Sequence, residues 1–427
     1  MRNVSRAVVQ RLGLLMVGLV VGLGLCEALL RLTLDRVEPV YGDFEVGFSA
    51  RPHRELDYPF EEHPGGHYII HWNNLGLRRD ADTAVEKPAG MCRVLVLGDS
   101  HTHCTCSNAE SYATIAERTL DAIEPGVQHE VLNAGHGFYS PYQYYRLLQY
   151  RLAELAPDAV VVGFYVGNDL LDLLRDEDRP SLSQLPDGQI VEVAPWFVTY
   201  EPPAARDSLR IHSQLYLRLS QAYSSLVGIT LSRAWMIYEG VRGEGYGPAD
   251  VLSYVRDFNK VKHLHGGAVA QSVGQQLYFQ HFPHQLETAW RLNAAVLDRF
   301  AAFAAAHRTP VVFAPIPTKL GIEPGDVGPL VDALAAALPS LSPERLRDTD
   351  DAYYERLLRQ LEKRGLPVLD LRPALRAAAA DDRVFYRSDF HLNLRGNAVM
   401  GRALAEWLDA HRAELLPACH ATESERL

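Results

Sequence analysis

The sequence predicts a three-layer α/β/α sandwich with a parallel sheet, carried behind an N-terminal transmembrane helix. Short, wholly apolar runs, typical of strands buried on both faces, alternate along the chain with longer amphipathic segments, typical of helices. Such alternation favours parallel strands joined by helical crossovers. The third observation is an apolar stretch that directly follows three arginines near the start of the chain. Its length and its cationic flank indicate the transmembrane helix.

The apolar stretch runs from Leu12 to Cys26 and continues after Glu27 to Leu30. Its length of about 19 residues is near that needed to cross a bilayer as a helix. A buried core helix would have a polar face, which this segment lacks. No Ala-x-Ala-like cleavage site follows, so we expect an uncleaved anchor and not a removed signal peptide. A lipoprotein signal at Cys26 is an alternative that the bulky Leu25 disfavours.

The arginines precede the apolar stretch, which predicts the orientation of the chain. We expect residues 1–11 to be a cytoplasmic tail and residues 12–32 to be the membrane anchor. The rest would lie outside the cytoplasm, in a periplasmic or extracellular space. Residues 33–91 read as a β-rich entry region that ends in a linker rich in turn signals. Residues 92–412 would form the catalytic domain, and residues 413–427 a C-terminal tail.

The core elements follow in order from residue 93. The sequence contains no Gly-x-Gly-x-x-Gly after a strand, no Walker motif and no Gly-x-Ser-x-Gly elbow, which argues against dinucleotide-binding, P-loop and α/β-hydrolase folds. We expect strands at residues 93–97, 129–133, 159–165, 310–314 and 367–371, and helices at residues 111–123, 142–155, 286–307, 352–364 and 397–413.

Residues 175–285 are predicted to be a helical insertion between the third and fourth strands. Residues 176–188 are polar and rich in turn signals, whereas residues 215–238 are apolar and helical in pattern. Arg218 and Arg233 make a second membrane span unfavourable. Two readings stay open: a lid or membrane-facing surface, and a helical hairpin that buries its apolar side on the sheet.

The first strand ends at Gly98, and Asp99 and Ser100 follow directly. Ligands of open α/β sheets bind at the carboxyl ends of the strands. Backbone N–H groups and a helix N-terminus behind Ser100 would suit a developing oxyanion. The alternative is a plain strand-to-helix turn in which Asp and Ser are ordinary cap residues.

Three further blocks follow in order: Asn133-Ala134-Gly135, Gly167-Asn168-Asp169 and Asp389-Phe390-His391. With Gly98-Asp99-Ser100, this series resembles the SGNH (GDSL-type) hydrolase family over roughly residues 92–412. An Asn-x-x-Gly-Leu-Arg stretch at residues 73–78 is similar to that of membrane-anchored members.

The resemblance implies a catalytic role for each block. Ser100 would be the nucleophile, His391 the general base, and Asp389 the carboxylate that orients the imidazole. The oxyanion hole would comprise Ser100 N–H, Gly135 N–H and the Asn168 side-chain amide. A side chain at position 135 would crowd the acyl carbon. The resemblance implies neither a cofactor nor a metal ion.

The last block departs from the commonest family pattern, Asp-x-x-His. Ser388 stands where that acid would be, and Asp389 lies two residues before His391. Asp-x-His occurs among membrane-linked and polysaccharide-modifying relatives, but Asp389 could also be a surface cap. His136 is a rival base because it directly follows Gly135.

Two histidines and two cysteines crowd the start of the site. A zinc site is one reading of this cluster, but its spacing is too tight for one tetrahedral ion. The other reading is a loop that lines the acyl pocket. The residues are His101, His103, Cys104 and Cys106.

The function expected from these features is that of a membrane-anchored, extracytoplasmic serine esterase. It would act on an O-acyl ester of a small molecule or a carbohydrate through an acyl-serine intermediate. One alternative is an O-acyltransferase that modifies a cell-surface or exported polysaccharide, and another is a non-catalytic glycan-binding or scaffold protein. The formal net charge of -11 argues against a nucleic-acid partner,.

Four cysteines lie beyond the anchor, in a compartment that permits disulfides. Cys92 stands at the entrance of the first strand, on the amino edge of the sheet. The predicted helix at residues 397–413 would run from the catalytic edge back to that edge and bring Cys419 close. A Cys92–Cys419 disulfide is therefore the hypothesis, with two unpaired thiols as the alternative.

Overall fold

The structure is a computed structural model of the chain. It describes residues 2–33, 42–43, 47–48, 50–174, 180–185, 187–193, 213–216, 218–219, 234, 237–238, 240–265, 273–325, 327, 332–333, 336, 338 and 343–419.

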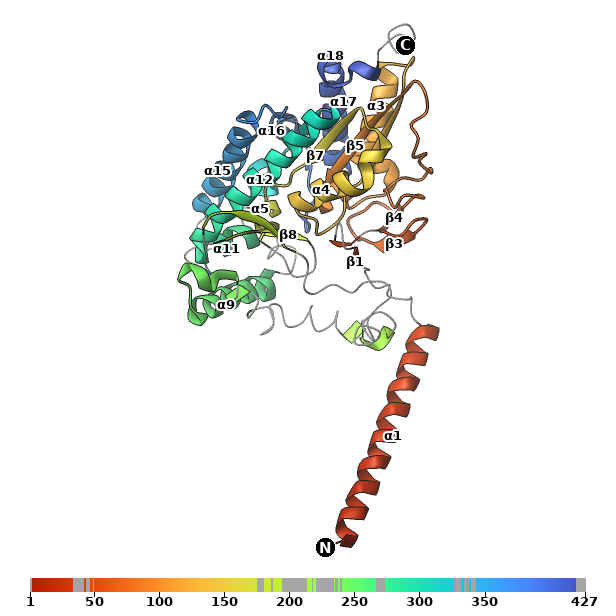
Figure 1. The fold of residues 1–427 in the computed structure, drawn as a ribbon, viewed down its shortest axis with the longest axis vertical. Helices are drawn as coiled ribbons and strands as arrows, with labels where there is room; N and C mark the ends of the chain where they lie inside the picture. The colour runs from red at the N-terminus through yellow and green to blue at the C-terminus, as the bar shows by residue number, and fades with distance from the viewer. Residues whose placement is uncertain are drawn as a thin grey trace.

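A four-stranded parallel sheet forms the centre of the fold (Figure 1). Its order is β10 (Val311–Phe313), β7 (Ala159–Gly163), β5 (Met91–Gly98), β6 (Gln128–Asn133). The predicted strands before residue 315 are therefore present. The fifth predicted strand, at residues 367–371, is reduced to one parallel bridge between Phe313 and Val368. The sheet with helices on both faces confirms the predicted three-layer class.

Residues 94–97 of strand β5 are all apolar because both faces of the strand are covered. Val94 and Val96 point into one hydrophobic core, and Leu95 and Leu97 point into the other. All four side chains are fully buried. Successive side chains of a strand face opposite sides, so helices on both faces of the sheet bury each of these four in turn.

Two helical layers cover these faces. Helices α3 (Tyr112–Ile123) and α17 (Leu394–Ala410) pack together over one core, side by side in Figure 1. Helices α4 (Pro141–Leu147) and α12 (Pro283–His307) contribute to the other core. Helix α15 (Pro343–Glu362) begins earlier than predicted, and α16 (Arg372–Ala379) follows it.

The predicted helix at residues 142–155 is regular only in its first half. After α4 the chain forms a π-helical turn, Leu148–Leu152, and a 3-10 turn, Ala153–Leu155. Ala156 then takes a left-handed conformation with φ 46°. Pro157 follows, and a residue before proline is disfavoured in the α region.

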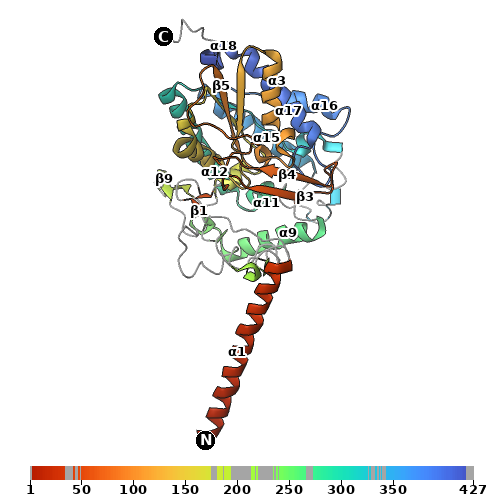
Figure 2. The ribbon, with the colours of Figure 1, turned by 90° about the vertical axis from the view of Figure 1, so that its right-hand side faces the viewer.

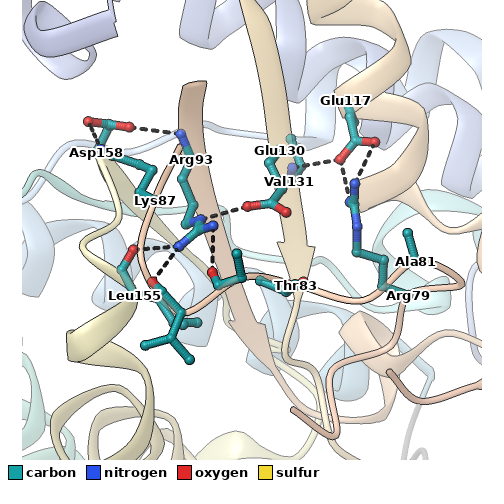
Figure 3. A network of polar contacts seen from close by, with 12 residues as sticks. Arg79, Ala81, Thr83, Lys87, Arg93, Glu117, Glu130, Val131, Leu155 and Asp158 are labelled. Carbon is teal, nitrogen blue, oxygen red and sulfur yellow. Dashed lines mark hydrogen bonds and ion pairs between the residues drawn. The ribbon is translucent and has the colours of Figure 1, made fainter. Parts of the chain in front are cut away.

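The linker before β5 is fastened to the amino edge of the sheet by the buried Arg93 (Figure 3). The guanidinium donates to Glu130 Oε2 at 2.6 Å, Leu155 O at 2.8 Å and Ala84 O at 2.9 Å. Asp158 accepts from Lys87 Nζ at 2.6 Å and from Arg93 N–H at 2.8 Å. A buried charge with this many partners fixes the register between linker and sheet.

The entry region contains an antiparallel hairpin of β3 (Glu55–Pro59) and β4 (His67–His71). Tyr68, Ile70 and Trp72 form a small hydrophobic cluster of their own. A short pair, β1 (Gly42–Asp43) with β2 (Gly47–Phe48), precedes the hairpin.

Helix α1 (Arg2–Thr33) extends away from the rest of the molecule (Figures 1 and 2). Its segment Arg11–Thr33 is long and apolar enough to cross a membrane, and its most apolar window is 0% buried. A signal sequence would have a similar length and apolar composition. Glu27 in this helix accepts hydrogen bonds from Ser213 Oγ at 2.9 Å and from Gln214 N–H at 2.8 Å.

The insertion between β7 and β10 is described in part. Residues 180–193 hold a hairpin of β8 (Ser181–Gln184) and β9 (Ile190–Val193), where the sequence suggested only turns. Helices α9 (Pro248–His265) and α11 (Gly274–His281) contribute buried side chains to the main core. This favours the packed reading for that part of the insertion. The apolar segment at residues 215–238, for which both readings were left open, lies largely outside the described residues.

Cys92 and Cys419 form a disulfide with a Cα–Cα distance of 5.1 Å. After α17, helix α18 (Arg412–Leu415) and the 3-10 turn Pro417–Cys419 bring the chain to the amino end of β5. The predicted pairing is therefore present in the structure.

We expect Cys419→Ser to lower the free energy of unfolding by roughly 2–4 kcal/mol, with roughly 5–6 kcal/mol as the chain-entropy upper bound for so long a loop. Denaturant titration of the full chain in detergent, without reductant, would measure the loss. Cys26→Ser, which removes a free cysteine in α1, is the matched control. Equal midpoints for Cys419→Ser and the unchanged protein would contradict the expectation.

Candidate active site

Ser100 is the first residue of a short helix, α2 (Ser100–His103), that begins where β5 ends. Asp99 caps this helix, since its Oδ1 accepts from His101 N–H at 2.9 Å. The cap reading of Asp99 is thus correct, but it leaves Ser100 partly exposed at the carboxyl edge of the sheet.

His391 and Asp389 meet Ser100 at this edge, although 291 residues separate His391 from Ser100 in the sequence. His391 Nε2 lies 2.9 Å from Ser100 Oγ, and His391 Nδ1 lies 2.5 Å from Asp389 Oδ1. Asp389 also accepts from the backbone N–H of His391 at 2.8 Å. The structure therefore brings together a hydroxyl, an imidazole and a carboxylate in the order that nucleophilic catalysis needs.

The protonation of this pair follows from its surroundings. Burial alone would lower the pKa of His391, but the hydrogen bond and charge of Asp389 outweigh it, and the pKa is raised above 6.5. Burial would raise the pKa of Asp389, but its bonds to His391 lower it below 3.8. The carboxylate is therefore charged wherever the imidazole titrates.

The rival base, His136, has other contacts. Its Nδ1 lies 3.2 Å from Gly137 O, and its ring stacks on Tyr139 with centroids 4.7 Å apart. Of the two histidines, His391 is the one that contacts Ser100 Oγ.

Gly135 is required by close packing against the backbone of α2. A Cβ at this position would lie 2.4 Å from His103 N and 2.5 Å from Thr102 C. This packing alone excludes a side chain at position 135, apart from the crowding of an acyl carbon that the sequence predicts. Gly135 N–H donates to Asn133 Oδ1 at 2.9 Å, so a substrate oxygen would have to share or replace that acceptor.

Asn168 directly precedes helix α5 (Asp169–Asp172). Its amide oxygen is buried and accepts no hydrogen bond from the described residues. Burial raises the pKa of the neighbouring Asp99 to about 7, and the Asn168 side chain is among the groups that oppose this rise. The side chains of Asn168 and Asp99 therefore lie close to each other.

Asp169 fixes the segment Gly167-Asn168-Asp169 through two buried hydrogen bonds. Its carboxylate accepts from Tyr144 OH at 2.7 Å and from Tyr165 N–H at 2.9 Å. Burial, with Asp99 nearby, raises its pKa well above 3.8. This residue holds the loop that presents Asn168.

His101 lies beside His391, in keeping with the reading of its loop as a lining of the site. Its ring stacks on Tyr165 at a centroid distance of 3.6 Å and lies 4.5 Å from the His391 ring. Burial, helped by His391, lowers the pKa of His101 well below 6.5. A neutral ring here supports His391 without adding a competing positive charge.

The zinc reading of the neighbouring cluster is wrong for its cysteines. Cys104 and Cys106 form a disulfide, so neither supplies the thiolate that zinc would require. The buried Arg78 of the entry region donates to Cys104 O at 2.7 Å and also to Cys106 O. Burial lowers the pKa of Arg78 to about 10. Through these hydrogen bonds, a residue of the entry region fixes the loop that follows Ser100.

Glu62 is a second residue that the sequence analysis missed. It lies in the β3–β4 loop and accepts from Arg387 N–H at 2.6 Å and Ser388 N–H at 2.7 Å. These bonds, with one from Ser388 Oγ, fix the loop that carries Asp389. No local sequence pattern predicts this contact, because Glu62 and residues 387–388 meet only in the folded chain.

We expect Glu62→Gln to lower kcat by on the order of tenfold to hundredfold with little change in KM, since a shifted base loses alignment with the nucleophile. The amide would place donors against the N–H groups of residues 387 and 388. Glu61→Gln alters the exposed neighbour and should leave kcat unchanged. A Glu62→Gln enzyme with full kcat would refute the positioning role.

The raised pKa of His391 predicts the pH profile. Since the neutral imidazole is the active form, the acid limb of kcat/KM should have its midpoint above pH 6.5,. Asp389→Asn should move that limb to lower pH, because burial then dominates, and should reduce kcat by roughly 10⁴-fold. Initial rates on a p-nitrophenyl ester from pH 5 to 9 would measure both, with the exposed Asp382→Asn as control. An acid limb that Asp389→Asn leaves unmoved would contradict the assignment.

A family model matches the C-terminal part of the chain. The family is described as ALGX, the SGNH hydrolase-like domain of the acetyltransferase AlgX, and the match spans residues 277–425. That stretch holds Asp389 and His391 and begins after Ser100. No curated protein sequence matches the chain.

The solved structures that match the chain share little sequence with it. LAE5, an alpha/beta hydrolase enzyme from the metagenome of Lake Arreo in Spain, is 13% identical at a TM-score of 0.35, covering 78% of this chain and 97% of its own. A catalytic mutant of Axe2, an acetylxylan esterase from Geobacillus stearothermophilus, is 11% identical at 0.37, covering 74% and 92%. The acetyl xylan esterase AlAXEase is 12% identical at 0.34, covering 74% and 99%. At such low scores, nothing about the substrate follows from these likenesses.

Proposed function

We propose that this chain, which belongs to the SGNH (GDSL-type) hydrolase family and is an ester hydrolase or O-acyltransferase, acts on O-acylated carbohydrate through an acyl-serine intermediate. The observation that carries the proposal is the continuous contact from Ser100 Oγ through His391 to Asp389. The relation of the family model to an acetyltransferase supports acetyl as the acyl group.

The first half of the reaction forms the acyl-enzyme. His391 Nε2 accepts the proton of Ser100 Oγ as that oxygen attacks the ester carbonyl. Asp389 stabilises the imidazolium, and the donors proposed for the developing oxyanion are Ser100 N–H, Gly135 N–H and the Asn168 side-chain amide. When the tetrahedral intermediate collapses, the bond to the sugar oxygen breaks, and His391 returns its proton to that oxygen.

The second half determines whether the enzyme hydrolyses or transfers. A water or an acceptor hydroxyl gives its proton to His391 Nε2 and attacks the acyl carbon. Collapse of the second intermediate frees Ser100 Oγ, which takes the proton back, and releases either the acid or a new ester. Both outcomes use the same three side chains, so the ratio of free acetate to acetylated acceptor distinguishes an esterase from a transferase.

We further propose that the catalytic domain lies outside the cytoplasm, with α1 as its anchor and residues 1–11 inside. The arginines that precede the apolar segment support this orientation,. The disulfides Cys92–Cys419 and Cys104–Cys106 support an oxidising compartment,.

We expect Ser100→Ala to abolish hydrolysis of p-nitrophenyl acetate and labelling by a fluorophosphonate while the fold is retained. Asn168→Ala should reduce kcat by on the order of 10²–10³, the usual loss for one oxyanion donor. A membrane-impermeant fluorophosphonate applied to intact spheroplasts, from which any outer membrane has been removed, tests both chemistry and location, with Ser253→Ala as a matched control on α9. Full activity in Ser100→Ala would exclude this nucleophile, and labelling only after lysis would exclude the proposed location.

A further inference from the structure

A buried lysine lies behind the loop that carries the candidate catalytic acid. Lys319 is the first residue of the short helix α13 (Lys319–Ile322), a few residues after the carboxyl end of β10. The residue is only 2% exposed. Because an ammonium removed from water is costly, acceptors close to it must compensate for the loss of hydration. The acceptors that it binds therefore indicate what this residue does.

Two acceptors of Lys319 are main-chain carbonyl groups just before Asp389. Lys319 Nζ donates to Tyr386 O at 2.7 Å and to Arg387 O at 3.2 Å. The same nitrogen lies 5.8 Å from the centroid of the Phe390 ring, in the residue that follows Asp389. One ammonium group therefore contacts the chain on both sides of the carboxylate that orients the imidazole.

The charge of Lys319 acts on Asp389 as well. Burial would raise the pKa of Asp389, but its bonds to His391 lower that pKa, and the positive charge of Lys319 lowers it further. The ionised carboxylate is the form that orients the imidazole and stabilises the imidazolium. The lysine thus favours both the placement and the charge that this acid needs.

The neighbours of Lys319 fix its own position. Thr318 caps α13, since its Oγ1 accepts from Gly321 N–H at 3.2 Å. The same hydroxyl donates to Asp350 Oδ2 at 2.6 Å, and Asp350 is buried in α15. The start of α13 is therefore bound to a long helix of the core, which gives the lysine a rigid base.

Two acidic side chains bind the N–H groups of the same loop. Glu323, four residues after Lys319, accepts from Val384 N–H at 2.5 Å and from Phe385 N–H at 3.2 Å. Glu62, from the entry region, accepts from two later N–H groups. Lys319 supplies the complementary contact, because it is the charged donor to carbonyl groups of this loop. Side chains of both signs therefore hold the main chain that leads to the catalytic acid.

We propose that Lys319 is a positioning residue of this site, which fixes the loop before Asp389 through two carbonyl groups and so holds the carboxylate against His391 Nδ1. This inference rests on the proposed function and deepens it by naming what aligns the acid. Lys319 acts through Asp389 and does not touch the substrate. Its loss should therefore impair the chemical step more than substrate binding.

The first test compares variants of the full chain in detergent. Lys319→Met keeps most of the side-chain volume but removes the donors, so the contact between Asp389 and His391 should lengthen. We expect kcat on p-nitrophenyl acetate to fall by about tenfold to a hundredfold with little change in KM. Lys319→Arg keeps a cation with several donors and should retain more of kcat than Lys319→Met. Lys363→Met, at an exposed position, is the matched control and should leave kcat unchanged.

The acid limb of kcat/KM separates positioning from two other roles of the lysine. The groups that face His391 are Asp389, Asp99 and the neutral His101. A looser contact with Asp389 lets burial dominate, so Lys319→Met should move the limb to lower pH, as Asp389→Asn should. Loss of a positive charge without movement of the loop would move the limb to higher pH. A purely structural role would lower the melting temperature without moving the limb. Either of these two outcomes would overturn the proposal.

A measurement without substrate separates this result from failure of the proposed function. NMR titration of the histidine-labelled protein gives the pKa of His391, with His391→Ala to assign its signal. A lower pKa in Lys319→Met, without any turnover by the unchanged protein, would support the positioning role and refute the proposed reaction. An unchanged pKa would refute the positioning role whatever the turnover. If Lys319→Met does not fold, Lys319→Gln, a shorter and neutral donor, should move the pKa in the same direction.

Discussion

The alignment of the site depends on the close approach of α17 to α3. A Cβ at Gly401 in α17 would lie 2.7 Å from Tyr112 O and from the side chain of Ile115 in α3, so only glycine permits this spacing. Asn397, buried between the helices, accepts from Tyr112 N–H at 3.3 Å and donates to Leu392 O at 3.0 Å. One amide thus links the helix that follows the nucleophile loop to the residue after His391. The packing of α17 on α3 and the hydrogen bonds of Asn397 maintain the 2.9 Å distance between Ser100 Oγ and His391 Nε2.

The entry region completes the site from the opposite direction. Arg78 holds the backbone after Ser100, and Glu62 holds the backbone before Asp389. These two charged side chains fix both catalytic loops by accepting from or donating to main-chain groups. The boundary at residue 91 therefore separates two parts of the sequence that form the candidate site together. The geometry of Ser100, His391 and Asp389 depends on contacts from the entry region as well as from the domain that carries them.

Sequence reasoning succeeded where a pattern is local. The apolar character of Val94 to Leu97 follows from burial on both faces, and the Cys92–Cys419 pairing followed from the length and direction of one helix. It failed where partners meet only in the folded chain, as for the contacts of Glu62 and Arg78 with the loops beside Asp389 and Ser100. The prediction of a fifth strand at residues 367–371 was wrong for another reason. Strand β10 is short, and this segment pairs with it only through the bridge between Phe313 and Val368. The close packing of Gly135 against the backbone of α2 was missed for the same reason as Glu62 and Arg78, because the two segments meet only in the folded chain.

The Cys92–Cys419 disulfide makes the catalytic domain a covalent ring, since the cysteines are 327 residues apart and enclose Ser100, Asn168 and His391. A protease that cuts once anywhere between them opens the ring without separating Ser100 from His391. The two pieces would stay joined at the amino edge of the sheet, while Ser100 and His391 lie at the other edge. A chain nicked once between the two cysteines would thus remain one molecule.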